Sequence, residues 1–326
     1  MNERGVIDQM LQAGLECPPL PLTMSGEKFR RFGRKKTSWY KLREMRLDSG
    51  RCVIVGAFGD WRMGLVQPVE VDWQGISEEE RESMRARQAE QAARAEEERR
   101  RASQLAAMTA GELWSQGATE GRSAYLDRKG VQGEVCRYLA DGSILVPLLR
   151  YDMPRNIALR AVQRIWPDGR KRFTKGFEKP GCCLRLGAIE DGAPILLAEG
   201  YATALTVRAA TAWGVPVVMC LDAGNLRPVA ELLRRLYPAS RLLICADDDW
   251  RTKGPDGTPL NVGRVKAGEV AKLLPGVDVV YPVWRGLRED GDTDFNDLQA
   301  REGLGAVTRQ LAWVLQAIRN KQVPHA

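Results

Sequence analysis

Residues 242–250 read LLICADDDW, an apolar run that ends abruptly in Asp247, Asp248 and Asp249. Three adjacent carboxylates repel one another, so a buried strand does not end in this way for stability. In extended chain, alternate side chains point to opposite sides, which places Asp247 and Asp249 together and Asp248 away from them. We expect the outer pair to share a cation, and Asp248 to cap, to hydrogen-bond or to face water.

Short apolar strands and helices alternate strictly around this run. In chain order, they are expected at 194–200, 201–214, 215–225, 226–238, 240–249, 263–276 and 277–284. Such alternation is typical of an α/β fold, in which helices cover a parallel sheet. Ligands of these sheets bind beyond the carboxyl ends of the strands. Glu199, Asp222, Asp247 and Asp249 are all expected at that edge.

Carboxylates that several strands bring to one edge predict a site for a hard divalent cation. Mg²⁺ takes oxygen ligands and is usually bound by one or two carboxylates together with substrate phosphate. We expect Mg²⁺ here, with Mn²⁺ as a substitute, held by Glu199, Asp247 and Asp249. Taken alone, the DDD run fits an acidic loop or a helix cap better than a metal site. The presence of Glu199 at the end of another strand favours the metal site.

The composition excludes several kinds of chemistry. The 326 residues are 44% apolar and carry a net charge of +7, which favours an anionic partner. The single histidine, His325, rules out histidine-dependent triads and HExxH zinc sites, and no phosphate-binding glycine motif occurs. Seven cysteines without a C-x-x-C pair indicate reduced thiols in the cytoplasm, with no zinc expected. No run of membrane-spanning length occurs, so no membrane partner is expected.

Composition also divides the chain into five parts. They are a small basic N-terminal module (1–76), a charged helical linker (77–104), an α+β segment (105–190), the parallel-sheet domain (191–302) and a C-terminal helix and tail (303–326). Within the first part, residues 27–46 hold nine basic residues against two acids, with interleaved aromatic rings. This pattern suits single-stranded nucleic acid, with Lys35, Lys36 and Trp39 as contacts. A small sheet with a core of aromatic residues fits equally well.

Several motifs resemble the Toprim domain, which DnaG-type primases, type IA and type II topoisomerases and some nucleases share. An acid–glycine pair ends one strand (LLAEGYATAL, 196–205), and D-x-D ends a later one (ICADDD, 244–249). AEGYATAL, LDAGNL (221–226) and DFNDL (294–298) are similar to the phage- and plasmid-encoded primases of mobile elements. GSILVPLL, LRAVQRIWPDGRKRF and CCLRLG (182–187) resemble the α+β primase-core segment that precedes Toprim in those proteins. RRFGRKKTSWYKL and GAFGDW resemble the N-terminal part of some of them.

The resemblance implies a nucleotidyltransferase that makes short RNA primers on single-stranded DNA from nucleoside triphosphates. Glu199 would be the general acid/base, and Asp247 and Asp249 would hold Mg²⁺. A third acidic motif is expected in DGDTDFNDL (290–298), where Asp292, Asp294 or Asp297 could bind metal and where we choose Asp297; a helix cap is the alternative. The implied nucleic-acid contacts, which a solvated turn would also explain, are Lys129, Arg164, Arg170, Lys171 and Arg172.

The sequence departs from the family pattern in two places. Thr203 stands where DnaG-type enzymes often carry a further aspartate, and no ligands for a zinc ribbon are present. No helicase motor occurs either, so a separate replicative helicase is an expected partner. A Toprim nuclease with the same carboxylates, and a non-catalytic accessory protein that binds single-stranded DNA, are the alternative functions.

Overall fold

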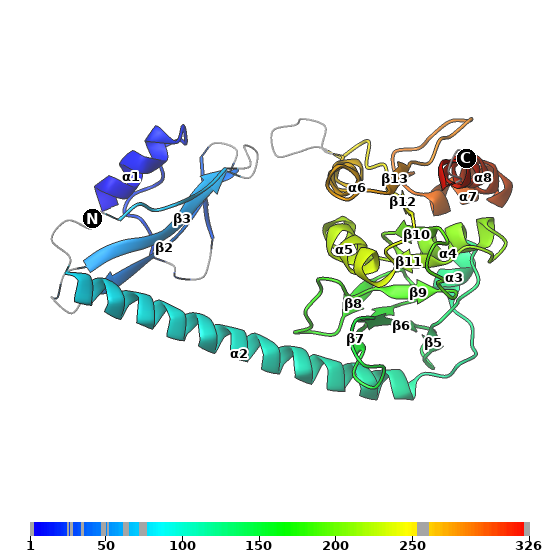
Figure 1. Ribbon diagram of the computed structural model, residues 1–326, viewed down its shortest axis with the longest axis horizontal. Coiled ribbons are helices and arrows are strands. Elements are labelled where there is room, and N and C mark those ends of the chain that lie inside the picture. The colour runs from blue at the N-terminus through cyan, green and yellow to red at the C-terminus, as the bar shows by residue number, and fades with distance from the viewer. Residues whose placement is uncertain are drawn as a thin grey trace. The chain divides into compact units, whose positions relative to one another are not determined.

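The computed structural model describes residues 3–252 and 261–322, apart from residues 25, 27–28, 34–35, 47–49, 51, 61–64 and 72–76 (Figure 1). The chain forms two compact units, one built mainly from residues before Glu98 and one from residues after it. Among the helices that the structure describes, none combines the length and the apolar character that a bilayer crossing requires.

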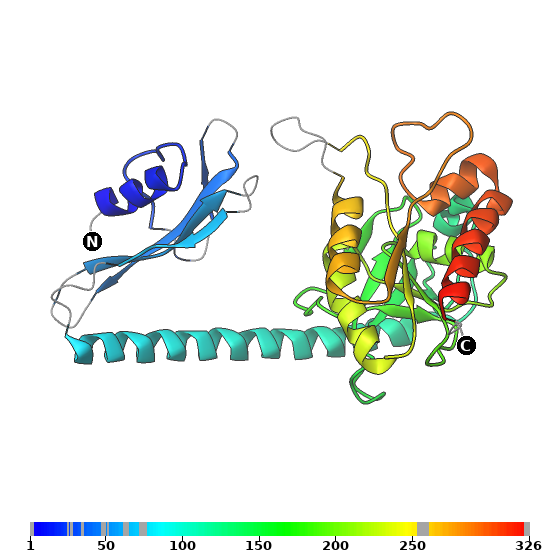
Figure 2. The same cartoon turned by 45° about the horizontal axis from the view of Figure 1, so that its top comes forward.

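The first unit is a small antiparallel sheet covered by helix α1 (Glu3–Gln12) (Figure 2). Its strands follow one another in the order β1 (Arg30–Phe32), β2 (Ser38–Arg46), β3 (Cys52–Asp60) and β4 (Leu65–Pro68). Phe32, Tyr40 and Phe58 are buried against Met10 of α1. Some of the aromatic rings in the basic stretch are therefore core residues.

Helix α2 (Glu78–Gln116) is longer than the charged helix expected at 77–104. It starts with a capping box, in which the backbone N–H of Glu80 donates to Ser77 Oγ and that of Ser77 donates to Glu80 Oε2. Its last turns stay helical because Ala110 is buried against Leu145 and Val162. Packing in the second unit thus extends the helix beyond its charged part.

A four-stranded antiparallel sheet opens the second unit, after the short helix α3 (Ala124–Lys129). Its strands, in spatial order, are β5 (Arg137–Tyr138), β6 (Ile144–Leu149), β7 (Leu159–Ile165) and β8 (Lys171–Phe173). Every residue of β6 except the last is buried. This sheet corresponds to the expected α+β segment.

The second sheet confirms the predicted α/β fold with a parallel sheet. Four strands are parallel and lie in the order β13 (Val277–Val280), β12 (Leu242–Cys245), β10 (Ile195–Ala198) and β11 (Val217–Met219). Strand β9 (Leu184–Leu186) adds an antiparallel edge beside β11, although it comes from the segment expected to precede this sheet.

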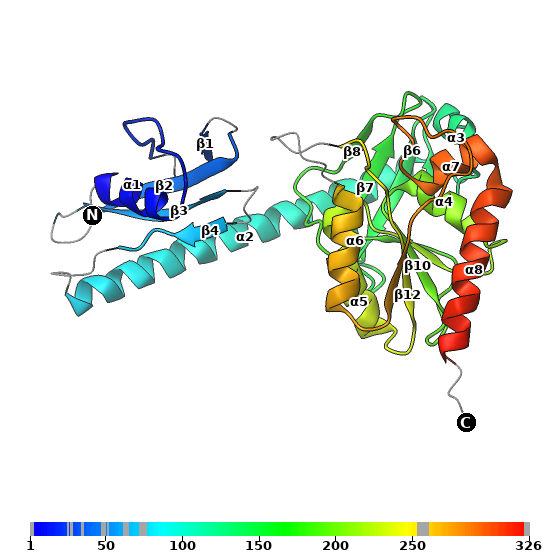
Figure 3. The ribbon, with the colours of Figure 1, turned by 90° about the horizontal axis from the view of Figure 1, so that it is seen from above.

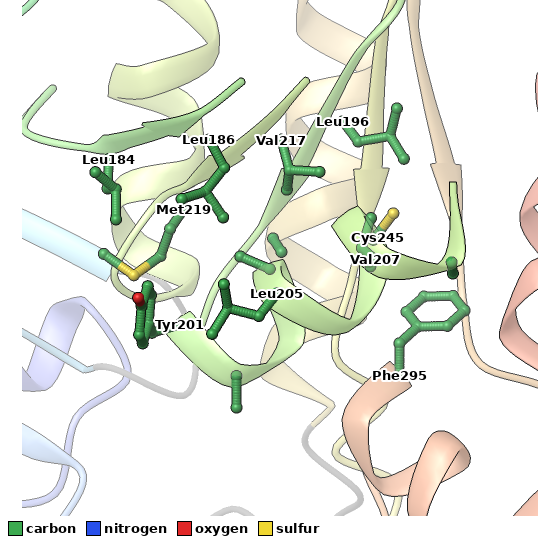
Figure 4. Packing of buried hydrophobic residues seen from close by; sticks show 14 of the residues in the cluster. Leu184, Leu186, Leu196, Tyr201, Leu205, Val207, Val217, Met219, Cys245 and Phe295 are labelled. Atoms are coloured by element: carbon green, nitrogen blue, oxygen red, sulfur yellow. The ribbon is translucent and has the colours of Figure 1, made fainter. Parts of the chain in front are cut away.

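Helices cover both faces of this sheet, as Figure 3 shows. On one face lie α5 (Leu226–Leu236) and α6 (Val262–Leu273); on the other lie α4 (Tyr201–Ala210), α7 (Phe295–Glu302) and α8 (Leu304–Gln322). The main core lies between the sheet and α4, with Leu205, Val207, Met219 and Phe295 in contact (Figure 4). The same core includes Ile144 of β6, so the two sheets of the second unit fold together.

Candidate active site

Two neighbouring strands deliver the predicted acids to one edge of the parallel sheet. Ala198, the last residue of β10, pairs in register with Cys245, the last residue of β12. Glu199 follows the first directly, and Asp247 and Asp249 follow the second after one or three further residues. The parallel register therefore places all three acids at the same carboxyl edge, which we call the acidic rim.

Burial and mutual repulsion raise the pKa values of two acids of the acidic rim. Burial, then the nearby charge of Asp249, raises the pKa of Glu199 to about 7, although the backbone amides of Asp247 and Ala223 act against the rise. Burial, then the charges of Glu199 and Asp294, raises the pKa of Asp247 to about 9. These carboxylates hold protons near neutral pH unless a cation replaces them.

The buried oxygens of the rim fit a cation. Glu199 Oε1 and Asp247 Oδ1 are both buried and have no hydrogen-bond partner. Buried polar atoms are nearly always bonded, so these two oxygens are open to a ligand. Among the described residues, no three His, Cys, Asp or Glu side chains form a ready metal cage. The two open carboxylate oxygens suit Mg²⁺, which keeps several waters and is usually bound by one or two carboxylates plus phosphate.

The third acidic segment places the predicted Asp297 in contacts within the protein. Asp297 Oδ2 accepts from the backbone N–H groups of Thr293 and Asp294, and Oδ1 lies 3.6 Å from Lys129 Nζ. Both oxygens of Asp297 thus have partners within the protein. The charge of Asp294 raises the pKa of Asp247 more strongly than the charge of Asp297 does. The metal role of Asp297 stays a prediction.

Asp294 is bound by Thr203, which stands where the family pattern often has an aspartate. Thr203 Oγ1 donates to Asp294 Oδ2 at 2.7 Å, while Asp294 Oδ1 caps helix α7 by accepting from the backbone N–H groups of Asn296 and Asp297. Burial raises the pKa of Asp294 above its ordinary value. The sequence left Asp292, Asp294 and Asp297 as alternatives, because their spacing does not reveal which one faces β12.

Asp222, the fourth acid expected at this edge, has a basic partner. Lys179 Nζ lies 2.9 Å from its Oδ2 and donates to both oxygens. Asp222 also caps the 3₁₀ turn η1 (Ala223–Asn225) by accepting from the Asn225 backbone N–H. Its charge still contributes to the raised pKa of Glu199. Asp222 therefore adds negative charge near Glu199, while its own carboxylate is bound by Lys179.

The middle aspartate of the DDD run hydrogen-bonds and does not face water. Asp248 is 4% exposed and binds the guanidinium groups of Arg264 and Arg288 and the amide of Asn261. Burial acts to raise the pKa of Asp248, but these three side chains together hold it below its ordinary value. No local sequence signal pointed to Arg288, which follows Asp248 by forty residues.

Two of the predicted basic contacts lie near the acids. Burial, then the charge of Lys129, lowers the pKa of Lys171, while the charges of Asp294 and Asp247 act in the opposite direction. Lys129 Nζ lies 3.6 Å from Asp297 Oδ1, and Lys171 feels the charges of both Asp294 and Asp247. Lys171 Nζ also lies 5.9 Å from the centre of the Tyr125 ring.

The arginines of the same strands have other partners. Arg164 binds Asp141 and Ser143 and stacks over Trp166, with its guanidinium carbon 4.8 Å from the ring centre. Arg170 pairs with Asp168 on the exposed turn. Arg172 is exposed and lies next to Lys171 on β8. Of the five predicted contacts in this unit, all of them described, only Lys129 and Lys171 act on the acids through their charges.

The predicted contacts of the N-terminal module belong to the other unit. Lys35 lies outside the described residues, and Lys36 is exposed. Trp39 is only 5% exposed and packs edge-on against Phe29, with ring centres 5.0 Å apart. A ring buried in this way offers no open face to a base, whereas Phe29 is 53% exposed.

The comparisons with known proteins agree with this geometry. Residues 194–305 match the family model of the Toprim domain. This part of the chain is a Toprim domain. Two proteins named DNA primase TraC, both from Escherichia coli, are relatives: one is 40% identical over 126 residues, and the other is 30% identical over 215 residues. They confirm the resemblance to Toprim DNA primases of the mobile-element type.

The Toprim domain and its flanking segments make up only part of these relatives. The first match covers 38% of this chain and 11% of the relative, and the second covers 64% and 14%. The chain therefore spans less than a sixth of the length of either. A solved structure, the primase fragment of the bacteriophage T7 primase-helicase protein, is 16% identical with a TM-score of 0.42; it covers 58% of this chain and 74% of that one.

The raised pKa values of Glu199 and Asp247 predict that the protein becomes less stable as the pH rises. Carboxylates whose folded pKa exceeds the unfolded value of about 4 contribute most below that value. Their contribution is lost as the pH rises through the folded pKa, about 7 for Glu199 and about 9 for Asp247. In EDTA, we therefore expect the melting temperature to fall as the pH rises from about 4 to about 9. Excess Mg²⁺ should oppose this fall. Thermal unfolding across pH checks this, and Glu199→Gln should show a smaller fall; an equal fall in both proteins would contradict it.

Proposed function

We propose that this chain carries the catalytic core of a DNA primase, a Mg²⁺-dependent nucleotidyltransferase that makes short RNA primers on single-stranded DNA. The acidic rim of the Toprim domain carries the proposal, because two buried carboxylate oxygens lack partners and two lysines lie beside the same acids. The relatives named DNA primase support it. One of them matches over 215 residues, more than the Toprim range of 194–305 holds.

Each group at the rim has a role that its surroundings suit. Asp247, with Asp249 and Asp294, would hold Mg²⁺, which neutralises phosphate charge and polarises the phosphoryl group when bound. Glu199, with a pKa of about 7, is suited to take the proton from the attacking sugar hydroxyl near neutral pH. Lys129 and Lys171 would bind the phosphates of the incoming nucleotide or of the template.

The remaining features suggest how the substrates and partners are engaged. The exposed basic side chains of the N-terminal module, with the half-exposed ring of Phe29, would contact single-stranded DNA. A separate replicative helicase would supply unwound template. Mn²⁺ would substitute for Mg²⁺ at the oxygen ligands.

A single assay separates this function from its alternatives. The chain is incubated with single-stranded DNA, ribonucleoside triphosphates and Mg²⁺, and the products are resolved by length. New oligoribonucleotides support primase activity, whereas shortened DNA identifies a Toprim nuclease. Bound but unchanged DNA identifies an accessory protein.

Neutralising the basic turn next to the Toprim acids is expected to weaken DNA binding and its salt dependence. With Arg170, Lys171 and Arg172 all changed to Gln, the slope of log affinity against log salt should fall by about 2, since each contact with a single strand contributes about 0.7. Binding titrations at several salt concentrations measure this. The matched control changes Arg227, Lys266 and Lys272 to Gln on α5 and α6, and should leave the slope unchanged. Equal effects of both triple variants would show that only net charge matters.

A further inference from the structure

Asp248 and Arg288 form a contact that joins two of the acidic segments. Arg288 NH1 donates to Asp248 Oδ2 at 2.7 Å, and NH2 donates to the Asp248 backbone carbonyl at 2.6 Å. Its Nε donates to the backbone carbonyl of Asp292 at 2.9 Å. One planar guanidinium group therefore binds both the DDD run after β12 and the loop that leads to Asp294.

Two tryptophan rings hold this guanidinium in place. The Arg288 guanidinium carbon lies 4.1 Å from the centre of the Trp284 ring and 4.8 Å from that of Trp250. The Arg288 side chain is 18% exposed, and that of Asp248 is 5% exposed. Stacking together with paired hydrogen bonds restrains an arginine far more than a surface ion pair does.

A backbone hydrogen bond completes the connection. The N–H of Asp248 donates to the carbonyl of Thr293 at 2.7 Å. Asp247 and Asp249 flank Asp248 in the chain, and Asp294 follows Thr293. The contacts that fix Asp248 against residues 292–293 therefore also fix Asp247 and Asp249 on one side and Asp294 on the other.

We propose that Arg288 is the positioning residue of the acidic rim. By binding Asp248 to the segment before Asp294, it fixes Asp247 and Asp249, which flank Asp248, against the segment that carries Asp294. This inference rests on the proposed function, since it concerns the same cation site. Residues that orient metal ligands typically affect metal affinity about 10- to 100-fold.

Arg264 has a different role at the same aspartate. Its Nε lies 2.6 Å from Asp248 Oδ1, but its side chain is 49% exposed, and it reaches only the carboxylate, not the backbone. Asn261 binds the same oxygen. Asp248 therefore keeps two partners when Arg288 is replaced, and the fold has a local reason to survive the change.

The test measures Mn²⁺ binding by titration with electron paramagnetic resonance, using the full chain. We expect Arg288→Met to bind about 10-fold more weakly than wild type. Arg288→Lys should be intermediate, because one ammonium group cannot serve Asp248 and Asp292 together. The control is Arg301→Met, since Arg301 contacts Asp292 and Glu289 but no residue of the DDD run; its affinity should stay within about twofold of wild type.

The Mg²⁺ dependence of primer synthesis provides a second measurement of metal affinity. In Arg288→Met, the Mg²⁺ concentration for half-maximal rate should rise by the same factor as the Mn²⁺ dissociation constant, while the rate at saturating Mg²⁺ changes by less than about threefold. Loss of stability alone would lower the melting temperature of the variant without moving this midpoint.

The possible outcomes are distinct. Wild-type affinity in both Arg288 variants overturns the inference, as does an equal loss in Arg301→Met. If Arg288→Met does not fold, Arg288→Lys is combined with Asp248→Asn, and additive losses of Mn²⁺ affinity overturn the inference. Absence of Mn²⁺ binding in wild type, or unchanged binding in Asp247→Asn, would instead refute the proposed function.

Discussion

Asp247→Asn is expected to abolish primer synthesis while leaving single-stranded DNA binding largely intact. The substitution keeps the shape of the side chain but removes the charge that would hold the cation. Charge stabilisation by a bound metal contributes several kcal/mol to such a transition state, so the rate should fall by about a thousandfold or more. Primer yield over time measures the loss, and fluorescence anisotropy with labelled DNA measures binding.

Stability separates a chemical defect from a folding defect in this variant. Burial, then the charges of Glu199, Asp294 and Asp249, raises the pKa of Asp247 to about 9. Without metal, removing this ionisable group should leave the melting temperature at alkaline pH unchanged or higher. Asp290→Asn is the control, since that side chain is 80% exposed and should retain full synthesis. Retained synthesis in Asp247→Asn would refute the metal role of Asp247.

Asp248→Ala is expected to lower the free energy of unfolding by about 3 kcal/mol, since removing one partner of a buried ion pair typically costs about 3–5 kcal/mol. The substitution leaves the mostly buried Arg288 without its carboxylate, and the amide of Asn261 loses an acceptor. We take the lower end because Arg264 is half-exposed and regains water. Equilibrium denaturation at neutral pH measures the change.

The neighbouring aspartate provides the comparison within the same run. Among the described residues, the carboxylate of Asp249 accepts one hydrogen bond, from the Gly263 backbone N–H at 3.1 Å, and it adds to the repulsion at Glu199. Losing that bond costs about 1 kcal/mol, and relief of repulsion offsets part of it, so Asp249→Ala should be nearly as stable as wild type. Equal destabilisation by Asp248→Ala and Asp249→Ala would mean that the contacts of Asp248 contribute little.

Local patterns were sufficient for the elements that surround the rim. Strand β12 is an apolar run of four residues, all buried, and β10 is the same. Because acids follow each strand within a few residues, and because parallel strands end at one edge, the meeting of Glu199 with Asp247 and Asp249 could be predicted. The opposite directions of Asp248 and its neighbours followed from the alternation of an extended chain.

Contacts between distant segments could not be predicted in this way. The helical pattern at 77–104 did not show that Ala110 would extend α2 by packing on β6 and β7. The aromatic residues near Trp39 were compatible with either a core or a DNA surface, and burial decided for the core at Trp39. Spacing alone could not show that Asp294, and not Asp297, acts more strongly on Asp247.

The sequence by itself determined which strands form the parallel sheet and which acids leave it at one edge, because apolar runs and strand direction are local properties. Only the tertiary structure decided which partners those acids have. Asp248 meets Arg288, Asp294 meets Thr203, and the lysines approach the rim through contacts between segments far apart in the chain. Such contacts depend on how whole elements pack, and neither periodicity nor charge pattern specifies that.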